Sequence, residues 1–262
     1  MRVAYQGEPG AYSEEAVVNY FGPDACQPVP CETFDDAFER LLAGQVEAAV
    51  LPVENSYAGD VGEVYDLLRR NDVWIHDELA LPVRHCLMAL PGVTLAELRS
   101  VRSHPQALSQ CRDYLRRHGL RAEPIHDTAA AARQVAAEGR RDLGAIAARR
   151  AASHYGLAVL AEGIQDAADN TTRFLVIAAP GASFHRVAHR ADPLDGAFSP
   201  ASRPQAKTYL LFAVADRPGA LYRCLAVLAE REINMTKLTS RPFPGRPWYY
   251  MFFADLDGTI ED

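Results

Sequence analysis

The chain contains two stretches of matching pattern, and this internal repeat constrains the fold more than any other feature of the sequence. Thr33 begins a run of apolar residues with helical spacing that stops at Gly44 and leads into the apolar residues 48–51. The same succession begins again at Thr128 and stops at Gly139. The residues that match at this offset are Thr33 with Thr128, Ala37 with Ala132, Gly44 with Gly139 and Glu47 with Asp142. Threonine suits a helix N-cap and glycine a helix end, so each copy predicts a helix followed by a buried strand.

Each copy of the repeat is preceded by a further strand, a polar loop and a helix that ends at a glycine, in residues 3–22 and 100–119. Two such series predict the α/β fold class, with two lobes that face each other. Ligand sites in these folds lie at the carboxyl ends of strands and between lobes. A chance similarity between two ordinary strand–helix units is the alternative interpretation.

The segment 169–174 is an unusual entry to a strand. Asn170, Thr172 and Arg173 stand before the apolar run 175–179, which predicts a buried strand. A hydrophobic core needs none of these side chains, whereas a site that binds an anion and donates hydrogen bonds uses all of them. The alternative is a polar turn held by threonine hydroxyls.

A second polar cluster follows the strand of the first repeat copy. Glu54, Asn55 and Ser56 supply hydrogen-bond donors and acceptors at the strand's carboxyl end, and Gly59 permits close approach of the backbone to a ligand. These residues could instead cap the helix that follows.

A third polar cluster occupies residues 103–111. Pro105 suits a first helical turn, so Ser103 is expected near a helix N-terminus, where the helix dipole favours an anion. Gln106 and Gln110 are four residues apart and therefore share one face of that helix. A solvated capping turn is the alternative.

Composition excludes several classes of partner. A net charge of −7 and a pI near 5.6 argue against a nucleic-acid partner. No apolar stretch approaches the roughly 18 residues of a membrane span, and a strand rather than a secretion signal is expected from residue 3. The five cysteines are scattered and form no CxxC motif, which is typical of reduced thiols. We therefore expect a cytoplasmic protein without a membrane partner.

The segment 181–206 has no sustained apolar period and is rich in proline, serine and alanine, so it is predicted to be a linker. His185 and His189 lie within it but have no third ligand nearby, and we expect no metal site.

Residues 207–262 are predicted to form a separate unit. A strand over 209–214, a helix that opens near Pro218, and strands over 233–239 and 248–256 give the order β-α-β-β. This order is most of a ferredoxin-like βαββαβ module. The sequence ends before a second helix and a last strand, so we expect the module to be incomplete.

The three polar clusters together resemble prephenate dehydratase. The resemblance is carried by the segments 54–56, 103–110 and 170–174. Three further segments also look like the family's segments and occur in the same order along the chain, namely 7–13, 155–157 and 164–166. The resemblance covers about residues 1–180 and implies a catalytic region like type II periplasmic binding proteins. Its lobes would be residues 1–78 with 160–180, and residues 79–159.

This resemblance implies the conversion of prephenate to phenylpyruvate, CO2 and water in phenylalanine biosynthesis, without a cofactor because aromatisation drives the reaction. Thr172 corresponds to the family's essential threonine and is expected to act as a positioned hydrogen-bond donor. Arg173 fits a carboxylate clamp. Phe174 is a substrate-contact candidate that is expected mainly to pack the strand entry. The other catalytic candidates are Asn55, Ser103, Gln110 and Glu54, and the other substrate-binding candidates are Ser56, Gly59, Gln106 and Ser13.

The C-terminal unit resembles the ACT regulatory domain through residues 218–221 and 239–242. The resemblance implies inhibition by phenylalanine in a homodimer or homotetramer. Its candidate phenylalanine contacts are Gly219, Ala220, Leu221, Asn234, Ser240, Arg241 and Pro242. Thr239 stands where the motif usually has glutamate, and this departure together with the incomplete module predicts weakened phenylalanine binding.

Two alternative functions remain open at this point. An arogenate dehydratase would act on a substrate that has an amino group in place of the keto oxygen. A non-catalytic amino-acid sensor could use the same lobes, although the presence of Asn55, Thr172 and Arg173 favours an enzyme. The sequence leaves the oligomeric state and the strength of inhibition undetermined.

Overall fold

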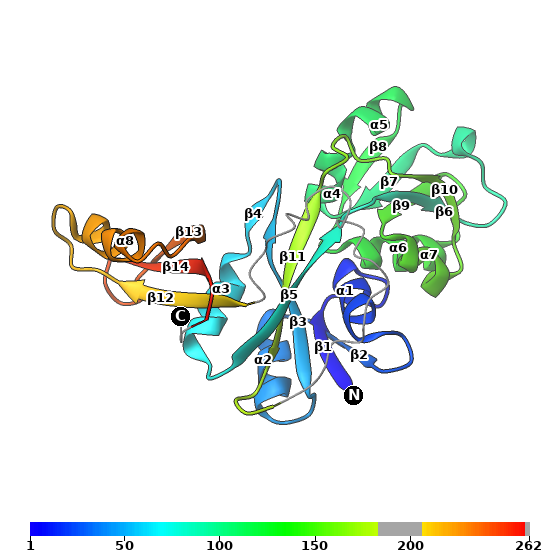
Figure 1. Ribbon diagram of the computed structural model, residues 1–262. Coiled ribbons are helices and arrows are strands. Elements are labelled where there is room, and N and C mark those ends of the chain that lie inside the picture. Colours follow the sequence, from blue (N-terminus) through cyan, green and yellow to red (C-terminus); the bar gives the residue numbers. More distant parts are fainter. Residues whose placement is uncertain (183–205, 260–262) are drawn as a thin grey trace. The chain divides into compact units, whose positions relative to one another are not determined.

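The computed structural model describes residues 1–182 and 206–259 (Figure 1). The chain divides into two compact units, Met1–Arg190 and Ala191–Asp262. The expected linker and its two histidines lie almost entirely outside the described residues. No helix in the described part is both long and apolar enough to cross a membrane.

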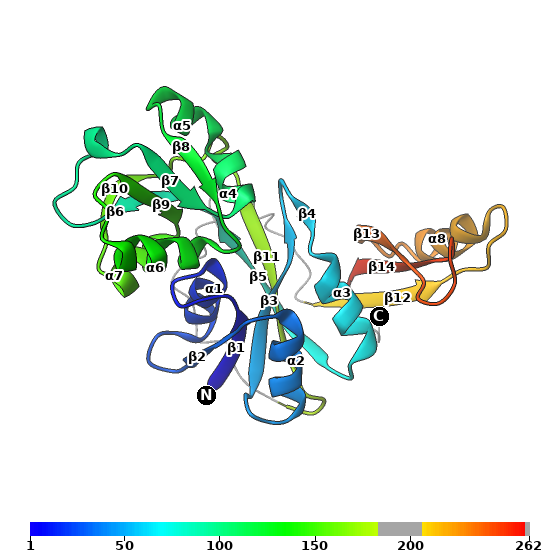
Figure 2. The same ribbon diagram turned by 180° about the vertical axis from the view of Figure 1, so that it is seen from behind.

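The first sheet of the larger unit has the order β2-β1-β3-β11-β5, with β4 paired to β3. Its strands are β1 (Arg2–Gln6), β2 (Gln27–Cys31), β3 (Ala48–Asn55), β4 (Gly59–Asp60), β5 (Trp74–Pro82) and β11 (Thr171–Ala178). Its helices are α1 (Tyr12–Phe21), α2 (Phe34–Leu42) and α3 (Gly62–Arg70). Side chains alternate between the two faces of each strand. Val3 and Tyr5 of β1 pack with α1, and α2 and α3 contact the sheet as well (Figures 1 and 2).

The second sheet has the order β10-β6-β9-β7-β8. Its strands are β6 (Cys86–Ala89), β7 (Ser100–Ser103), β8 (Arg121–Pro124), β9 (Leu143–Ala147) and β10 (Ala158–Glu162). Its helices are α4 (Pro105–Gln110), α5 (Arg112–Arg117), α6 (Thr128–Glu138) and α7 (Arg149–Tyr155), with a 3₁₀ turn at Leu95–Glu97. The fully buried, alanine-rich face of α6 packs closely on β9.

The two sheets share the arrangement of their three parallel strands, in agreement with the sequence repeat. In each sheet three parallel strands, β2-β1-β3 or β8-β7-β9, are followed by an antiparallel neighbour, β11 or β6. Thr33 caps α2 in a capping box with Asp36. The matching prediction for Thr128 is wrong by one residue, because the Asp127 carboxylate accepts the Ala130 N–H at 2.8 Å and caps α6 instead. The α/β class is confirmed, whereas the likeness to type II periplasmic binding proteins stays a prediction.

Two connections join the sheets, namely residues 83–85 between β5 and β6, and residues 163–170 between β10 and β11. They bond to each other, since Val83 N–H donates to Asn170 O at 2.8 Å and Ile164 N–H to His85 O at 3.1 Å. At both connections the boundary between the lobes differs from the expected one, which was residues 78/79 and 159/160. All of β5 belongs to the first sheet, and β10 pairs with β6 in the second.

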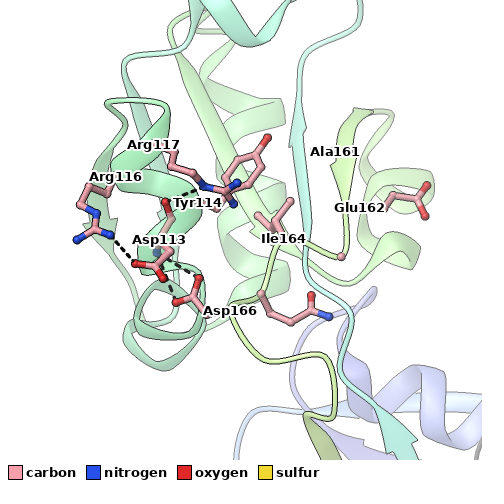
Figure 3. Close-up of a pocket in the computed structure, with 10 residues that line it drawn as sticks. Asp113, Tyr114, Arg116, Arg117, Ala161, Glu162, Ile164 and Asp166 are labelled. Carbon is pink, nitrogen blue, oxygen red and sulfur yellow. Dashed lines mark hydrogen bonds and ion pairs between the residues drawn. The ribbon is translucent and has the colours of Figure 1, made fainter.

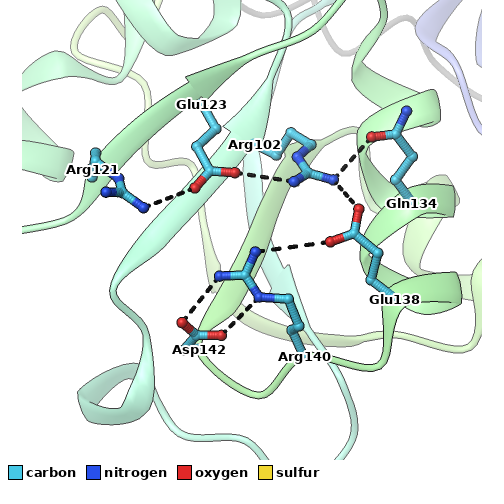
Figure 4. A network of polar contacts seen from close by, with 7 residues as sticks. All are labelled: Arg102, Arg121, Glu123, Gln134, Glu138, Arg140 and Asp142. Carbon is cyan, nitrogen blue, oxygen red and sulfur yellow. Dashed lines mark hydrogen bonds and ion pairs between the residues drawn. The ribbon is translucent and has the colours of Figure 1, made fainter.

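A polar network ties β7, β8 and α6 together in the second sheet (Figure 4). Arg102 of β7 forms ion pairs with Glu123 of β8 at 3.1 Å and Glu138 of α6 at 2.5 Å, and it also donates to Gln134. The Arg102 side chain is only 14% exposed, so these partners satisfy its charge where water cannot. The network therefore fixes the end of the sheet that carries β8.

The smaller unit is a three-stranded antiparallel sheet of order β12-β14-β13 with one helix. Its elements are β12 (Lys207–Ala213), α8 (Ala220–Glu230), β13 (Met235–Pro242) and β14 (Tyr250–Asp257). Gly219 precedes α8 at φ +74°, a left-handed conformation that glycine adopts without strain. The described residues thus show the predicted β-α-β-β order.

Candidate active site

Asn55 ends β3 and links the segments that the sequence analysis singled out. Its side chain is buried, and its Oδ1 atom accepts the N–H groups of Tyr57 at 3.1 Å and Ala58 at 2.9 Å. Because backbone N–H groups can only donate, they define which end of the amide is the oxygen. The Asn55 amide nitrogen therefore faces β11.

Thr172 receives a hydrogen bond from this amide. Asn55 Nδ2 lies 3.0 Å from Thr172 Oγ1 and 2.8 Å from Asn170 Oδ1, with the Thr171 carbonyl at 3.2 Å. The hydroxyl oxygen of Thr172 acts as acceptor in this contact, so its own proton points elsewhere. Within the described residues no protein acceptor takes that proton. The Thr172 hydroxyl thus has a hydrogen that no described protein group accepts.

Asn170 provides a second donor beside Thr172. The residue is 2% exposed, and its Nδ2 atom is buried without a hydrogen-bond partner among the described residues. An unsatisfied buried donor costs about 1–3 kcal/mol, which a ligand or an ordered water would recover. The sequence analysis named Asn170 within its segment but did not select it as a site residue.

Helix α4, which follows β7 of the second sheet, places polar side chains close to Asn55. His104 precedes the helix and accepts the Gln106 N–H at 3.2 Å through Nδ1, while burial lowers its pKa and favours the neutral ring. Gln106 Nε2 lies 3.5 Å from Asn55 Oδ1. Gln110, one turn later, places Oε1 2.9 Å from His85 Nε2. Gln106 and Gln110 therefore both contact residues at the junction of the lobes.

His85, which the sequence analysis did not select, contacts the site candidate Gln110. It lies in the connection between β5 and β6, is 3% exposed, and contacts Tyr12 OH through Nδ1 at 2.9 Å. Desolvation lowers its pKa, against a smaller opposite effect of the hydrogen bond with Gln110. A single histidine in a short connection has no spacing pattern, so the sequence carried no signal for it.

Several predicted site residues have structural partners instead. Ser103 is fully buried and donates to the Ile146 carbonyl at 2.6 Å. Phe174 is 1% exposed and packs in the core beside α1. Ser56 Oγ accepts the Thr171 N–H at 3.0 Å, which fastens β3 to β11. Their role as site residues stays a prediction.

Gly59 and Ser13 are placed by the fold in different ways. Gly59 begins β4 at φ +79°, with open space where a side chain would be, so the turn requires glycine for its conformation. Ser13 is buried within the first turn of α1.

Glu54 and Arg173 lie on the strand faces opposite to Asn55 and Thr172, because successive side chains alternate. Arg173 forms ion pairs with Glu54 and with Glu78 of β5, each at 3.1 Å, and its side chain is 17% exposed. Two protein carboxylates hold this guanidinium in the structure, and the expected carboxylate clamp stays a prediction. β5 supplies Glu78 only through sheet register, which the sequence did not reveal.

A separate hollow of about 460 Å³ lies beside α5 in the second sheet (Figure 3). Asp166 accepts the Asp113 N–H at 3.1 Å, and Asp113 in turn pairs with Arg116 at 3.1 Å. The charged side chains of this hollow thus largely engage one another. Among the described residues, no group of three or more histidine, cysteine or acidic side chains is arranged to hold a metal ion.

Comparison with known proteins gives a consistent result. A family model described as prephenate dehydratase matches residues 3–182. "Arogenate dehydratase/prephenate dehydratase 2, chloroplastic" of Arabidopsis thaliana is 42% identical over 271 residues, and "Arogenate dehydratase 2" of Petunia hybrida is 42% identical over 276. Each alignment covers 100% of this chain and 66% of the relative, so the chain spans just under two thirds of these relatives.

Solved structures match the whole chain, among them the following two. A prephenate dehydratase from Arthrobacter aurescens in complex with L-Phe is 31% identical at a TM-score of 0.85, over 82% of that chain. A protein described as GqqA, a novel type of quorum quenching acylase, is 35% identical at a TM-score of 0.85, over 89% of that chain.

The expectation of a cytoplasmic protein is contradicted by these relatives. Several of them, including the two Arabidopsis dehydratases numbered 1 and 2, are named chloroplastic. The cysteine argument could not make this distinction, because thiols stay reduced in more than one cellular compartment.

Proposed function

We propose, since the chain belongs to the prephenate dehydratase family, that it converts prephenate to phenylpyruvate, water and CO2 as a hydro-lyase of phenylalanine biosynthesis. The family model spans most of the larger unit, and the full-length alignments to named dehydratases support the assignment.

The chemistry needs a donor at the leaving hydroxyl. Cleavage of the ring carboxylate releases CO2, and its electron pair moves through the ring to expel hydroxide, which takes a proton and leaves as water. The ring becomes aromatic, so the thermodynamic drive resides in the substrate. The protein must stabilise the departing oxygen and orient the dianion.

The observation that carries the proposal is the contact of Asn55 with Thr172. It directs the Thr172 hydroxyl as a donor, which is the function that an oxygen leaving group requires. Gln106, Gln110 and Asn170 add amide donors around it for the carboxylates of the substrate. Both sheets contribute, so ligand binding and lobe arrangement are expected to be coupled.

Arogenate is the alternative substrate, favoured by the names of several relatives. It differs from prephenate by an amino group in place of the keto oxygen, which lies on the side chain and not on the ring whose bonds to the carboxylate and the hydroxyl break. Parallel assays of phenylpyruvate release from prephenate and phenylalanine release from arogenate decide between them. Absence of turnover with both would contradict the proposal and favour a non-catalytic sensor.

The smaller unit is proposed to be an ACT regulatory domain that binds phenylalanine. A hollow of about 400 Å³ is lined by Gly219, Ala220 and Leu221 together with the aromatic residues Trp248 and Tyr250. The L-Phe complex of the Arthrobacter relative supports a phenylalanine ligand. Ser240, Arg241 and Pro242 lie at the end of β13 and remain candidates. Asn234 Nδ2 donates to Asp257 at 2.7 Å, and its second amide hydrogen and its oxygen are the groups that we propose for a ligand.

Regulation and assembly have direct tests. Calorimetry with phenylalanine measures binding, and steady-state rates with and without phenylalanine measure inhibition. Light scattering of the intact chain reports whether it is the homodimer or homotetramer that we propose. Failure of phenylalanine to bind would remove the regulatory assignment without affecting the catalytic one.

A further inference from the structure

The ring of His85 is held between residues of both lobes. Its Nδ1 atom lies 2.9 Å from the hydroxyl of Tyr12, the first residue of α1, and its Nε2 atom lies 2.9 Å from Oε1 of Gln110, the last residue of α4. The backbone is fixed as well, because His85 N–H donates to Gln165 Oε1 at 3.0 Å.

With the Gln110 oxygen facing His85, counting protons across these contacts gives one tautomer. Gln110 Oε1 can only accept, so Nε2 of His85 must carry the hydrogen. In a neutral ring Nδ1 is then an acceptor, and the Tyr12 hydroxyl donates to it. Burial lowers the pKa of His85, which favours the neutral ring, and burial together with Cys86, Glu15 and Cys111 raises the pKa of Tyr12, which keeps its proton.

A second arrangement is available to the same three side chains. Tyr12 OH also lies 2.9 Å from the Arg84 carbonyl and has one proton to donate. If it donates there, Nδ1 of a neutral His85 must carry the hydrogen, and Nε2 becomes an acceptor. The Gln110 amide would then have to turn over, so that its nitrogen faces His85 and its oxygen faces away. The tautomer of His85 and the orientation of Gln110 are therefore coupled.

We infer that Tyr12 and His85 are positioning residues that hold the Gln110 amide with its NH2 group turned toward the substrate. This inference rests on the proposed function. The backbone of Gln110 is anchored through its carbonyl, which accepts the Asp166 N–H at 2.7 Å. Within the described residues the Gln110 amide nitrogen has no protein partner. A substrate with two carboxylates accepts hydrogen bonds, whereas the turned amide would present an oxygen and repel it.

A double-mutant cycle tests the inference on the full chain. His85→Leu should lower kcat/KM about tenfold, which is the usual effect of losing one well-placed hydrogen bond. In a Gln110→Ala background the same substitution should change kcat/KM less than twofold, because the residue through which it acts is gone. His85→Gln, which can still donate from an amide nitrogen, should recover most of the loss.

Tyr12→Phe removes the donor to Nδ1 and should lower kcat/KM about threefold to tenfold, while Tyr114→Phe is the matched control outside this contact and should leave it unchanged. Nitrogen NMR of the wild-type protein should show the His85 proton on Nε2. A proton on Nδ1 would overturn the positioning role. So would effects of the two substitutions on kcat/KM that multiply in the double mutant. Neither result would contradict the proposed function as long as the wild-type chain turns over its substrate. A wild-type chain inactive on both prephenate and arogenate would overturn the proposed function and this inference with it.

Discussion

The amide nitrogen of Asn55 lies 3.0 Å from the hydroxyl oxygen of Thr172, and this contact joins the ends of β3 and β11. Two backbone N–H groups fix the amide, and the amide fixes the hydroxyl. The donor that the proposed reaction needs is thus oriented by the fold before any ligand binds, which is the arrangement that lowers an activation barrier most effectively.

Removal of the Thr172 hydroxyl should abolish most activity. Thr172→Ala is expected to lower kcat about 10²–10³-fold, the typical effect of losing a donor that acts in the transition state. Thr172→Ser keeps the hydroxyl and is the matched control, expected within about tenfold of wild type because its rotamer is less restricted. Steady-state kinetics decides: an alanine variant within threefold of wild type would remove Thr172 from the mechanism.

Asn55→Asp separates folding from catalysis. The carboxylate still accepts the Tyr57 and Ala58 N–H groups, so the turn after β3 should remain. It cannot donate to Thr172, and it places an oxygen against Asn170 Oδ1. We expect kcat to fall about 10²-fold with Tm lowered by only a few degrees. If thermal unfolding and activity were lost together, Asn55 would be a structural residue.

Arg173→Lys should affect stability more than substrate affinity. The guanidinium bridges Glu54 and Glu78, and one ammonium cannot reproduce both contacts. The unfolding free energy should fall by about 1–2 kcal/mol, which is less than for a fully buried ion pair because the Arg173 side chain is partly exposed. KM should stay within about twofold of the wild-type value. Arg116→Lys, in an exposed ion pair, is the control and should change stability by less than about 0.5 kcal/mol. A tenfold rise in KM at unchanged stability would restore the carboxylate clamp.

Gly10→Ala should weaken the contact between the loop before α1 and helix α7. A Cβ atom at Gly10 would lie 2.7 Å from Ala151 Cα, in addition to the strain of φ +93°. Gly92→Ala carries similar strain at φ +76° but meets nothing within 4 Å. Urea unfolding should therefore show a loss for Gly10→Ala at least about 1 kcal/mol greater than for Gly92→Ala. Equal losses of unfolding free energy in the two variants would show that the close approach of Gly10 to Ala151 does not affect stability.

Much of the site was predictable because polar residues at strand ends have no role in a core. Asn55, Thr172 and the pair Gln106 and Gln110 were predicted on this ground, and the structure brings them to one junction. The repeat likewise predicted two α/β lobes, since local caps and apolar periods specify each strand–helix unit, and the structure contains two such sheets.

The remaining features depend on contacts between distant segments. Arg173 meets Glu78 only because β11 pairs with β5 in one particular register, and His85 reaches Tyr12 across 73 residues of sequence. Ser103 matches a family position but bonds to the carbonyl of a neighbouring strand. Local pattern does not encode such partners, so they required the three-dimensional structure.

Turnover of prephenate by the wild-type chain and by Thr172→Ala, measured side by side as phenylpyruvate formed, tests the account most directly. The account predicts release of phenylpyruvate and CO2 in equal amounts by the wild type, and a rate at least about 10²-fold lower for the variant at unchanged unfolding temperature. Equal rates from the two proteins, or no product from a folded wild type with either prephenate or arogenate, would contradict it.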